Sequence, residues 1–514
     1  MMVFSFFRLN GRMTNETLEK GRSVKNKIRY AFTSSNYWSS TEYNANNAWN
    51  VNFGSGNVNN NNKYNSNVVR PVAALNEERK SFWVDSFDDC CRHKKSSDNC
   101  IRYRINYEYD LFKLAEEVEF GYYKPSTSVC FCVTRPKLRE VFAANFRDRI
   151  VHHWLMLKLN PLFEQRFVEQ GNVSFNCRKG YGTMKAVEAL KEDIRFVSEN
   201  YTNDDCWVGR FDFIGFFMSC DKDILLEQLH WFVYDKYKGE DIDIVWRTLE
   251  IVIRHNPSTN CVKHGQIDLF EQLPPHKTLF KTPEGKGMPI GNLTSQILLN
   301  FYMSFFDERM SEFCKLRGGR YERFVDDFTV VMKSPKDVVD AFRYADEISQ
   351  SMLKIRLHHD KVYIQHYSKG IKFVGYVVKY DRVYLSNRTF GHMEYRMDYI
   401  ERLCGRINTT KRRVVAFNRL NNAIMSINSY TGFAVHTNGY GKTKKILFKY
   451  KKTYNFAFFK RNKLVFKIRS YYKIGEILYE KDRLERSRMS SCLHDKEKRR
   501  FATNNGICRY RACA

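Results

Sequence analysis

Long apolar runs are absent from this 514-residue sequence, and none reaches the ~18 residues that a membrane-spanning helix requires. The opening MMVFSFFRLN is too short for a signal peptide and lacks its charged-then-apolar order. The 14 cysteines include close groups at Cys90, Cys91 and Cys100 and at Cys130 and Cys132, but neither group has the spacing of a zinc knuckle. We therefore expect a cytoplasmic protein with reduced thiols and no membrane partner.

Acidic residues are scarce relative to basic ones. Lys and Arg number 85 against 57 Asp and Glu, which gives a formal net charge of +28. An excess of this size favours a polyanionic partner, nucleic acid first and an anionic membrane surface second. Residues 386–470 alone hold 19 Lys or Arg against 3 Asp or Glu, with aromatic residues interspersed. This pattern favours a groove that follows a phosphate backbone and stacks on bases; a solvated helical face is the alternative.

Composition also separates the chain into segments. Residues 36–67 contain 13 Asn, a residue that favours turns over helix interiors and strands. Between 206 and 385, strand-like runs such as CWVGRFDFI and YERFVDDFTVVM alternate with helical stretches. Strands interleaved with helices favour an α/β or α+β core.

Two adjacent aspartates, Asp326 and Asp327, interrupt the apolar run YERFVDDFTVVM. Burying two negative charges there is costly, and a divalent cation offsets their repulsion and their desolvation. Because successive strand residues point to opposite faces, both carboxylates can approach one ion only from the tip of a tight hairpin. We expect Asp326 to be the closer ligand and Asp327 to be a supporting one.

Asp212 is the candidate for the further carboxylate that a metal site needs. It ends the strand-like run CWVGRFDFI, and two such strands side by side would bring Asp212 and Asp326 to one edge of a sheet. That arrangement suits two Mg²⁺ ions about 4 Å apart, which would lower the pKa of a 3′-hydroxyl and stabilise a pyrophosphate leaving group. An isolated Asp-Asp pair is more often a surface turn, but the apolar flanks and Asp212 disfavour that alternative.

Six blocks, in order, resemble those of reverse transcriptases over about residues 100–450. VTRPKLREVFAANFRDRIVHHWL (133–155) resembles the fingers block, RFDFIGFF the first metal motif, and GKGMPIGNLTSQILLNFYMSFFD (285–307) the motif at the template–nucleotide junction. FVDDF resembles the metal hairpin, LHHDKVYIQ the block that carries Lys361, and IKFVGY the primer grip. The resemblance implies an α+β right-hand polymerase with fingers, a palm of antiparallel sheet plus helices, and a helical thumb.

The resemblance also implies roles for individual residues. It adds Phe213 to the three aspartates as a metal ligand, and it makes Lys361 a proton donor to pyrophosphate. Phe217, five residues after Asp212, takes the steric-gate position that excludes a ribose 2′-hydroxyl, although Phe216 and Phe217 could both be core. The nucleotide-binding set is completed by Ile290 and Gln296 and by Arg139 with either Arg135 or Lys137, which would meet the incoming triphosphate.

The segment IGNLTSQ (290–296) resembles the reverse transcriptases of diversity-generating retroelements, as do RDRIVHH, LPPHKTLF (273–280) and NSYTG (428–432). Group II intron and retron enzymes usually have Gln where this chain has Ile290. An aliphatic side chain there lacks the polar contacts of Gln near the nascent base pair, which could raise misincorporation. The resemblance implies error-prone copying of a template-repeat RNA into cDNA, with misincorporation at template adenines, for diversification of a target gene.

Partners follow from the same resemblance: template RNA, a primer or cDNA, dNTPs and an oligomer of a small basic accessory variability protein. Three alternatives stay open. The chain could be another bacterial reverse transcriptase, of group II intron, retron or phage-defence type. It could be a non-catalytic nucleic-acid-binding protein on a degenerate polymerase scaffold, although all three aspartates are present. A lectin-like ligand-binding protein is suggested only by the Asn-rich leader.

That leader, WSSTEYNANNAWNVNFGSGNVNNNNKYNSNVVRPVAAL, resembles the C-terminal part of C-type-lectin-like variable proteins, the usual targets of these elements. We interpret residues 1 to about 75 as read-through of the template repeat, with an ordinary N-terminal extension as the alternative. The expected organisation is a poorly ordered leader (1–80), an N-terminal extension and fingers (81–205), a palm (206–385), a basic thumb (386–450) and a basic C-terminal extension (451–514).

Overall fold

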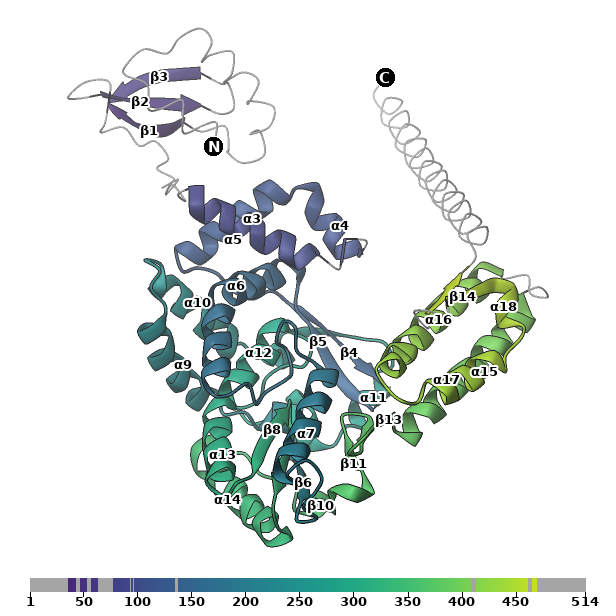
Figure 1. Ribbon diagram of the computed structural model, residues 1–514. Helices are drawn as coiled ribbons and strands as arrows, with labels where there is room; N and C mark the ends of the chain where they lie inside the picture. The colour runs from purple at the N-terminus through teal and green to yellow at the C-terminus, as the bar shows by residue number, and fades with distance from the viewer. Residues whose placement is uncertain are drawn as a thin grey trace. The chain divides into compact units, whose positions relative to one another are not determined.

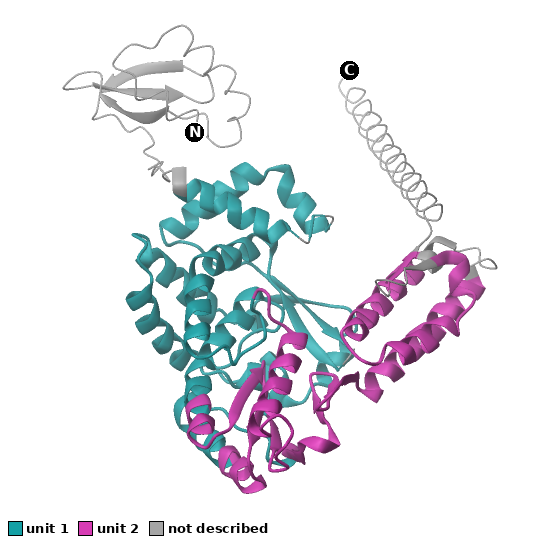
Figure 2. Cartoon of the chain, in the orientation of Figure 1, with its two compact units in different colours: residues 1–178, 212–310, 343–360 teal, residues 179–211, 311–342, 361–514 magenta. Residues whose placement is uncertain are grey.

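The computed structural model describes residues 36–42, 47–52, 57–62, 77–92, 94–95, 97–134, 137–407, 413–460 and 465–468. The chain divides into two compact units, coloured in Figure 2. Unit 1 comprises residues 1–178, 212–310 and 343–360, and unit 2 comprises residues 179–211, 311–342 and 361–514. Within the described ranges every cysteine is free, and no helix combines the length and apolar character needed to cross a membrane.

Unit 1 is mainly helical (Figure 1). Its helices are α3 (Glu77–Cys91), α4 (Asp98–Ile105), α5 (Tyr107–Glu119), α6 (Phe146–Glu169), α8 (Phe216–Ser219), α9 (Lys222–Lys236), α10 (Ile242–Arg254), α11 (Asp268–Glu271) and α12 (Leu293–Tyr302), with the 3-10 turns η1 (Pro257–Thr259), η2 (Pro275–Lys277) and η3 (Leu279–Lys281). In α10 the buried residues Val245, Leu249 and Ile253 recur at helical spacing and form one apolar face. Helices α13 (Ser304–Leu316) and α14 (Pro335–Leu353) run across the division between the units.

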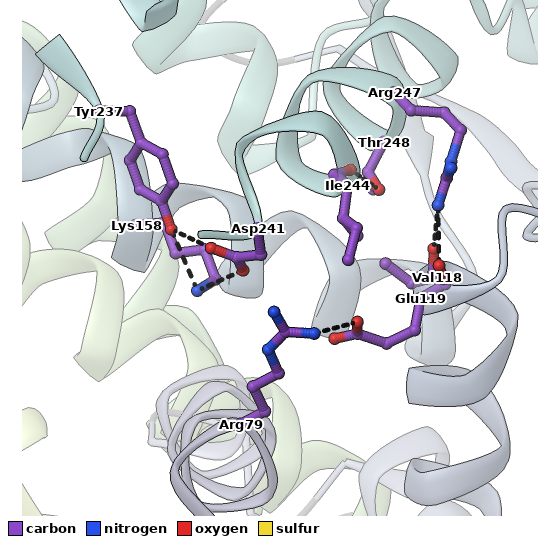
Figure 3. A network of polar contacts seen from close by, with 9 residues as sticks. All are labelled: Arg79, Val118, Glu119, Lys158, Tyr237, Asp241, Ile244, Arg247 and Thr248. Atoms are coloured by element: carbon purple, nitrogen blue, oxygen red, sulfur yellow. Dashed lines mark hydrogen bonds and ion pairs between the residues drawn. The ribbon is translucent and has the colours of Figure 1, made fainter. Parts of the chain in front are cut away.

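Polar contacts attach the first helices of unit 1 to the helices that follow (Figure 3). Arg79 on α3 forms an ion pair with Glu119 at the end of α5 (2.9 Å), and Arg247 on α10 donates to the Glu119 carbonyl (2.9 Å). Lys158 on α6 pairs with Asp241, just before α10, at 3.0 Å. Because most of these groups are largely buried, water screens the contacts less than it screens exposed ion pairs. They fix α3 and α5 against the body of unit 1.

Three strands of unit 1 lie in the leader: β1 (Asn36–Glu42), β2 (Asn47–Asn52) and β3 (Asn57–Asn62). They form an antiparallel sheet in the order β1-β2-β3. These three segments have strand conformation, and the expected poor order of the leader as a whole stays a prediction. In NAWNVN, the apolar residues Trp49 and Val51 lie two positions apart and are separated by Asn50, and that period of two is typical of a strand even where Asn propensity opposes one. The remaining leader residues lie outside the described ranges.

A second sheet of unit 1 consists of β4 (Ser128–Val133), β5 (Arg139–Ala143) and β7 (Cys261–His264), in the order β5-β4-β7. Strand β4 is antiparallel to β5 and parallel to β7. The pairs run from Val129 opposite Ala143 to Val133 opposite Arg139, so β4 and β5 form the hairpin of the expected fingers block.

Unit 2 contains a four-stranded sheet in the order β10-β6-β9-β8. Its strands are β6 (Trp207–Asp212, of which the last residue, Asp212, falls in unit 1), β8 (Arg320–Phe324), β9 (Asp327–Met332) and β10 (Tyr363–His366), and helix α7 (Thr183–Val197) contacts β8 and β9. Strand β10 is antiparallel to β6, and β8 is antiparallel to β9. The ring of Phe211 packs against those of Phe328 and Phe342, at centroid distances of 5.3 and 5.1 Å. This sheet is the core of the expected palm.

The rest of unit 2 begins with the 3-10 turns η4 (His359–Lys361, of which only Lys361 falls in unit 2) and η5 (Tyr367–Lys369) and a sheet of β11 (Ile371–Phe373), β12 (Tyr376–Val378) and β13 (Val383–Leu385). It continues with α15 (Asn387–Ile407), α16 (Arg413–Val435), α17 (Tyr440–Phe448), α18 (Thr453–Phe456), β14 (Ala457–Lys460) and β15 (Val465–Ile468). Glu401 on α15 accepts hydrogen bonds from the backbone of Lys452 and Thr453, at 2.9 and 3.0 Å. The Asn428 amide on α16 pairs with both backbone groups of Phe466. Lys452, Thr453 and Phe466, which follow the predicted end of the thumb at 450, are thus attached to α15 and α16.

A buried pair of carboxyl groups joins α7 to the sheet of unit 2. Glu322 on β8 is 5% exposed, and Oδ2 of Asp193 on α7 is inaccessible to solvent. Burial raises the pKa of Asp193 to about 7, and burial together with the Asp193 charge raises the pKa of Glu322 well above its ordinary value. Glu322 therefore keeps its proton near neutral pH and shares it with Asp193 in a hydrogen bond.

We expect the Asp193–Glu322 pair to make unit 2 less stable as pH rises. Between the ordinary pKa of Asp and the raised pKa of about 7, the folded protein holds a proton that the unfolded chain releases. Stability from this pair is therefore complete at low pH and lost as pH rises to about 7. The double variant Asp193→Asn, Glu322→Gln should show a smaller fall in thermal midpoint between pH 5 and pH 8 than the wild type, by roughly 3 °C for each kcal/mol involved. Glu188→Gln, an exposed acidic residue on α7, is the control, and an equal fall in all three proteins would contradict the assignment.

Candidate active site

The β8–β9 hairpin carries two of the predicted metal ligands. Phe324 and Asp327 form its last pair, so Val325 and Asp326 make a two-residue turn. Val325 has φ 62, a left-handed conformation that is unfavourable for a β-branched residue. Backbone strain of this kind costs of order 1–3 kcal/mol and tends to occur at functional sites. The tight hairpin expected from FVDDF is present, with Asp326 in the turn and Asp327 at the start of β9.

A buried cation supports this turn. Arg323 is fully buried, and its Nη1 donates to the Val325 carbonyl at 2.9 Å. The guanidinium fixes the strained residue and places a positive charge near two half-buried aspartates. Sequence reasoning missed Arg323, because an arginine next to a loop is usually solvated.

Asp212 is the last residue of β6, the strand next to β9 in the sheet order. It is half-buried, and its carbonyl accepts from the His358 backbone at 2.8 Å. Phe213 is 2% exposed, and its ring packs against Phe306 at 5.5 Å. Because a phenyl ring has no ligating atom, Phe213 could contact a metal only through its backbone carbonyl.

The carboxylates fit a hard cation by their chemistry, since Mg²⁺ takes oxygen ligands. In the described part of the chain, no three His, Cys, Asp or Glu side chains form a metal-binding group. Mg²⁺ in nucleotide enzymes is usually held by one or two carboxylates together with substrate phosphates and water, so a closed protein cage is not required. The two-ion site remains a prediction.

Unit 1 brings two of the predicted nucleotide-binding residues into one cluster. Phe217 and Ile290, both partly buried, pack on a core made by Cys130, Phe142, Met218, Phe270 and Leu279. Phe280 packs on the same core. Phe216, by contrast, is 4% exposed, so the structure separates a buried ring from the accessible ring of Phe217. The choice of Phe217 for the gate is consistent with this difference.

The loop that carries Ile290 lies directly on strand β5. The Phe142 N–H donates to the Ile290 carbonyl at 2.7 Å. Gly291 follows with φ 122, and a Cβ at this position would come within 2.5 Å of the Phe142 carbonyl oxygen. Only glycine allows this approach. This close packing fixes the position of the Ile290 backbone against β5.

The remaining predicted residues are more exposed. Lys137 and Arg139 lie at the β4–β5 hairpin, and Lys361 ends η4 in unit 2. Gln296 on α12 accepts a hydrogen bond from the Cys177 thiol at 3.1 Å. Arg135 lies outside the described residues. Unit 1 therefore brings Phe217 and Ile290 together on one core, whereas Lys137, Arg139 and Gln296 are presented on the exposed hairpin and on α12.

Sequence reasoning also missed Glu140 and Phe280. Glu140 follows Arg139 at the start of β5 and is fully buried. The signal was present, because alternation along REVFA puts Glu140 on the same face as Phe142, which is apolar. An acidic residue on an apolar strand face indicates a buried and partnered carboxylate.

Comparison with known proteins finds similarity in the central part of the chain. Residues 133–378 match the family model described as "Reverse transcriptase (RNA-dependent DNA polymerase)". The chain is also similar to protein YkfC of Escherichia coli (strain K12), with 23% identity over 295 residues that cover 51% of this chain and 69% of that protein. The family match, together with the helices and antiparallel sheets, confirms the predicted α+β right-hand polymerase fold.

Two solved telomerase structures are more distant. Apo telomerase from Candida tropicalis, truncated from the C-terminal domain, has a TM-score of 0.36 and 11% identity and covers 55% of this chain. Telomerase from Candida albicans in complex with a TWJ fragment of telomeric RNA has a TM-score of 0.37 and 12% identity and covers 66% of this chain. The matches span 60% and 61% of those two chains.

Gly291→Ala should destabilise unit 1. The new Cβ would lie 2.5 Å from the Phe142 carbonyl oxygen, and the alanine would have to keep the positive φ of 122. Strain and displacement together should cost more than about 2 kcal/mol. Gly285→Ala is the matched control, because its φ is 73 and no atom lies within 4 Å of the added Cβ, which leaves a cost of about 1 kcal/mol. Thermal denaturation should rank Gly291→Ala below Gly285→Ala, and the reverse order would contradict the contact.

Proposed function

Because residues 133–378 form a reverse transcriptase domain, we propose that the chain is an RNA-directed DNA polymerase that extends a primer 3′-hydroxyl along an RNA template. The observation that carries this proposal is the two-residue turn that contains Asp326, directly before β9. Strand β9 is next to β6 in the sheet, and β6 ends at Asp212. Template RNA, primer or cDNA, and dNTPs are the substrates and partners that this activity requires.

Asp212 and Asp326 are proposed to hold two Mg²⁺ ions, with Asp327 in support. When bound, the ions lower the pKa of the primer 3′-hydroxyl and stabilise the charge of the leaving pyrophosphate. Phe213 adds its backbone carbonyl to the ligand set. The buried Arg323 guanidinium keeps the turn in place through the Val325 carbonyl. These groups position the acceptor hydroxyl and the nucleotide, which is how most of the rate of such a transfer is gained.

Roles toward the nucleotide are proposed for residues of each unit. Arg139, with Lys137 or Arg135, binds the triphosphate of the incoming nucleotide, and the planar guanidinium of Arg139 suits two phosphate oxygens at once. Phe217 lies against the sugar and excludes a 2′-hydroxyl by size. Lys361 donates a proton from Nζ to the departing pyrophosphate. Ile290 and Gln296 contact the template–nucleotide junction.

The basic helices of unit 2 are proposed to hold the template–primer duplex. Their charges are accessible and alternate with rings: Lys442 Nζ lies 4.4 Å from the Phe390 ring centroid, and Lys444 Nζ lies 4.5 Å from that of Tyr440. Lys and Arg in this arrangement bind phosphates with a strong dependence on salt. The exposed cations of α15 and α17 are Arg388, Arg402, Arg406, Lys442 and Lys445.

We further propose that the enzyme belongs to a diversity-generating retroelement and copies a template-repeat RNA with errors at adenines. The support is the IGNLTSQ segment, in which Ile290 packs on the same core as Phe217. In this proposal residues 1 to about 75 derive from the template repeat, and an accessory variability oligomer assists template binding. Another bacterial reverse transcriptase, of group II intron, retron or phage-defence type, is the alternative. The cytoplasmic location stays a prediction.

Asp326→Ala should abolish primer extension on an RNA template. Loss of a metal ligand removes several kcal/mol of transition-state stabilisation, so we expect a fall of about a thousandfold in rate. Asp327→Ala should cause a smaller loss, because Asp327 supports the site. Extension of a labelled primer in Mg²⁺ buffer measures both.

Asp381→Ala is the matched control for this experiment, since Asp381 is a turn aspartate of unit 2 between β12 and β13. Its rate should equal that of the wild type, and thermal midpoints confirm that all variants are folded. Activity retained by a folded Asp326→Ala protein would refute the metal assignment and favour a non-catalytic binding protein.

Ile290→Gln should lower the error rate at template adenines. The amide restores polar contacts near the nascent base pair, and a change of 1–2 kcal/mol in discrimination is roughly a tenfold change in misincorporation. Sequencing of cDNA made on an RNA template gives the error rate for each template base. Leu293→Gln introduces the same amide at an exposed position of α12 and serves as the control. An unchanged error rate in Ile290→Gln would end this explanation of infidelity.

A further inference from the structure

Glu140 on β5 is a fully buried carboxylate, two residues before Phe142 of the core on which Phe217 and Ile290 pack. Its neighbour across the β4–β5 hairpin is Cys132, which packs on the same core as Phe217 and Ile290. A buried charge costs several kcal/mol unless other groups pair with it. The partners of Glu140 therefore have to be firmly placed.

Those partners come from the segment LPPHKTLF. The Thr278 hydroxyl donates to Glu140 Oε2 at 2.7 Å, and the Leu279 N–H donates to Oε1. Both residues are 2% exposed. Burial raises the pKa of Glu140, and the hydrogen bonds from Leu279 and Thr278 and the charge of Lys263 act against that rise. Two donors from adjacent residues hold this segment on β5.

The clamped segment leads directly into Phe280. The Phe280 N–H donates to the Thr278 hydroxyl oxygen at 3.3 Å, so the same hydroxyl links Glu140 to the backbone of Phe280. The Phe280 ring lies 5.7 Å from that of Phe142, and Lys263 Nζ lies 4.3 Å from its centroid. Glu140 thus fixes a ring that packs on the core shared by Phe217 and Ile290.

We propose that Glu140 is a positioning residue for nucleotide selection, which clamps residues 278–280 so that Phe280 supports the surface formed by Phe217 and Ile290. This proposal rests on the proposed polymerase function. A steric gate works only if its ring cannot move away from the sugar, so the groups that support it must be held within about 0.5 Å. A loosened clamp admits the larger ribonucleotide, whereas a deoxynucleotide still fits.

The test compares Glu140→Gln with the wild type. Gln keeps the size of Glu but replaces one acceptor oxygen with an amide that cannot accept from Thr278 or Leu279. The ratio of kcat/KM for dNTP to that for rNTP should fall roughly tenfold or more, with a smaller change in kcat for dNTP. Hydrogen exchange should become faster at the amides of residues 279–282 in the variant.

Asp241→Asn is the matched control. Asp241 is also a buried carboxylate of unit 1 that pairs with a lysine and a hydroxyl, Lys158 at 3.0 Å and Tyr237 at 2.7 Å (Figure 3), and none of the three belongs to the core on which Phe217 and Ile290 pack. It should leave the dNTP to rNTP ratio at the wild-type value. Thr278→Val, which removes only the hydroxyl donor, should lower the ratio in the same direction as Glu140→Gln and replaces it if that variant does not fold.

The outcomes separate the two proposals. A wild-type protein without primer extension would overturn the proposed function and, with it, this role of Glu140. An active Glu140→Gln enzyme with the wild-type ratio, or with unchanged exchange at residues 279–282, overturns only the clamp. A lowered ratio in both Glu140→Gln and Thr278→Val, but not in Asp241→Asn, supports it.

Discussion

The constraint on the β8–β9 hairpin is that two half-buried carboxylates lie at the turn between two largely buried strands. Strands β8 and β9 are almost continuously buried, and the two aspartates occur where β8 ends and β9 begins. A sheet that turned gradually would place these charges among apolar side chains. The two-residue turn keeps them at the margin, and the strain at Val325 and the burial of Arg323 are consequences of that choice. Strand β9 is buried from Phe328 to Met332, whereas β8 also buries the charged side chains of Glu322 and Arg323.

Under the proposed function, nucleotide selectivity in unit 1 would depend on a group of packed residues more than on any single side chain. Phe217, Ile290 and Phe280 share one core, and the backbone of the Ile290 loop rests on β5 through Phe142. A close-packed cluster transmits small displacements from one member to the others. Differences in fidelity between related enzymes would accordingly arise from residues under this surface as well as from those that face the nucleotide.

Short sequence patterns predicted those parts of the site that depend on neighbouring residues. The FVDDF hairpin and the strand ending at Asp212 follow from apolar runs interrupted by acids. Spacing selected Phe217 for the gate position but left both rings as possible core residues. The exposed fractions of the side chains distinguish the buried Phe216 from the partly buried Phe217. Glu140 was missed because its partners, Thr278 and Leu279, lie about 140 residues away in sequence. The attachment of Lys452 and Thr453 through Glu401, and of Phe466 through Asn428, is also between residues distant in sequence, so composition does not reveal it.

The ion pair between Arg79 and Glu119 limits where translation of a shorter product that keeps it could begin. If the leader derives from a template repeat, a shorter product that keeps this pair has to be initiated at or before codon 79. The sequence has no methionine between Met13 and Met156. A product that begins at Met13 keeps both residues of the pair, whereas one that begins at Met156 lacks both. An internal start at Met156 would also remove strands β4 and β5.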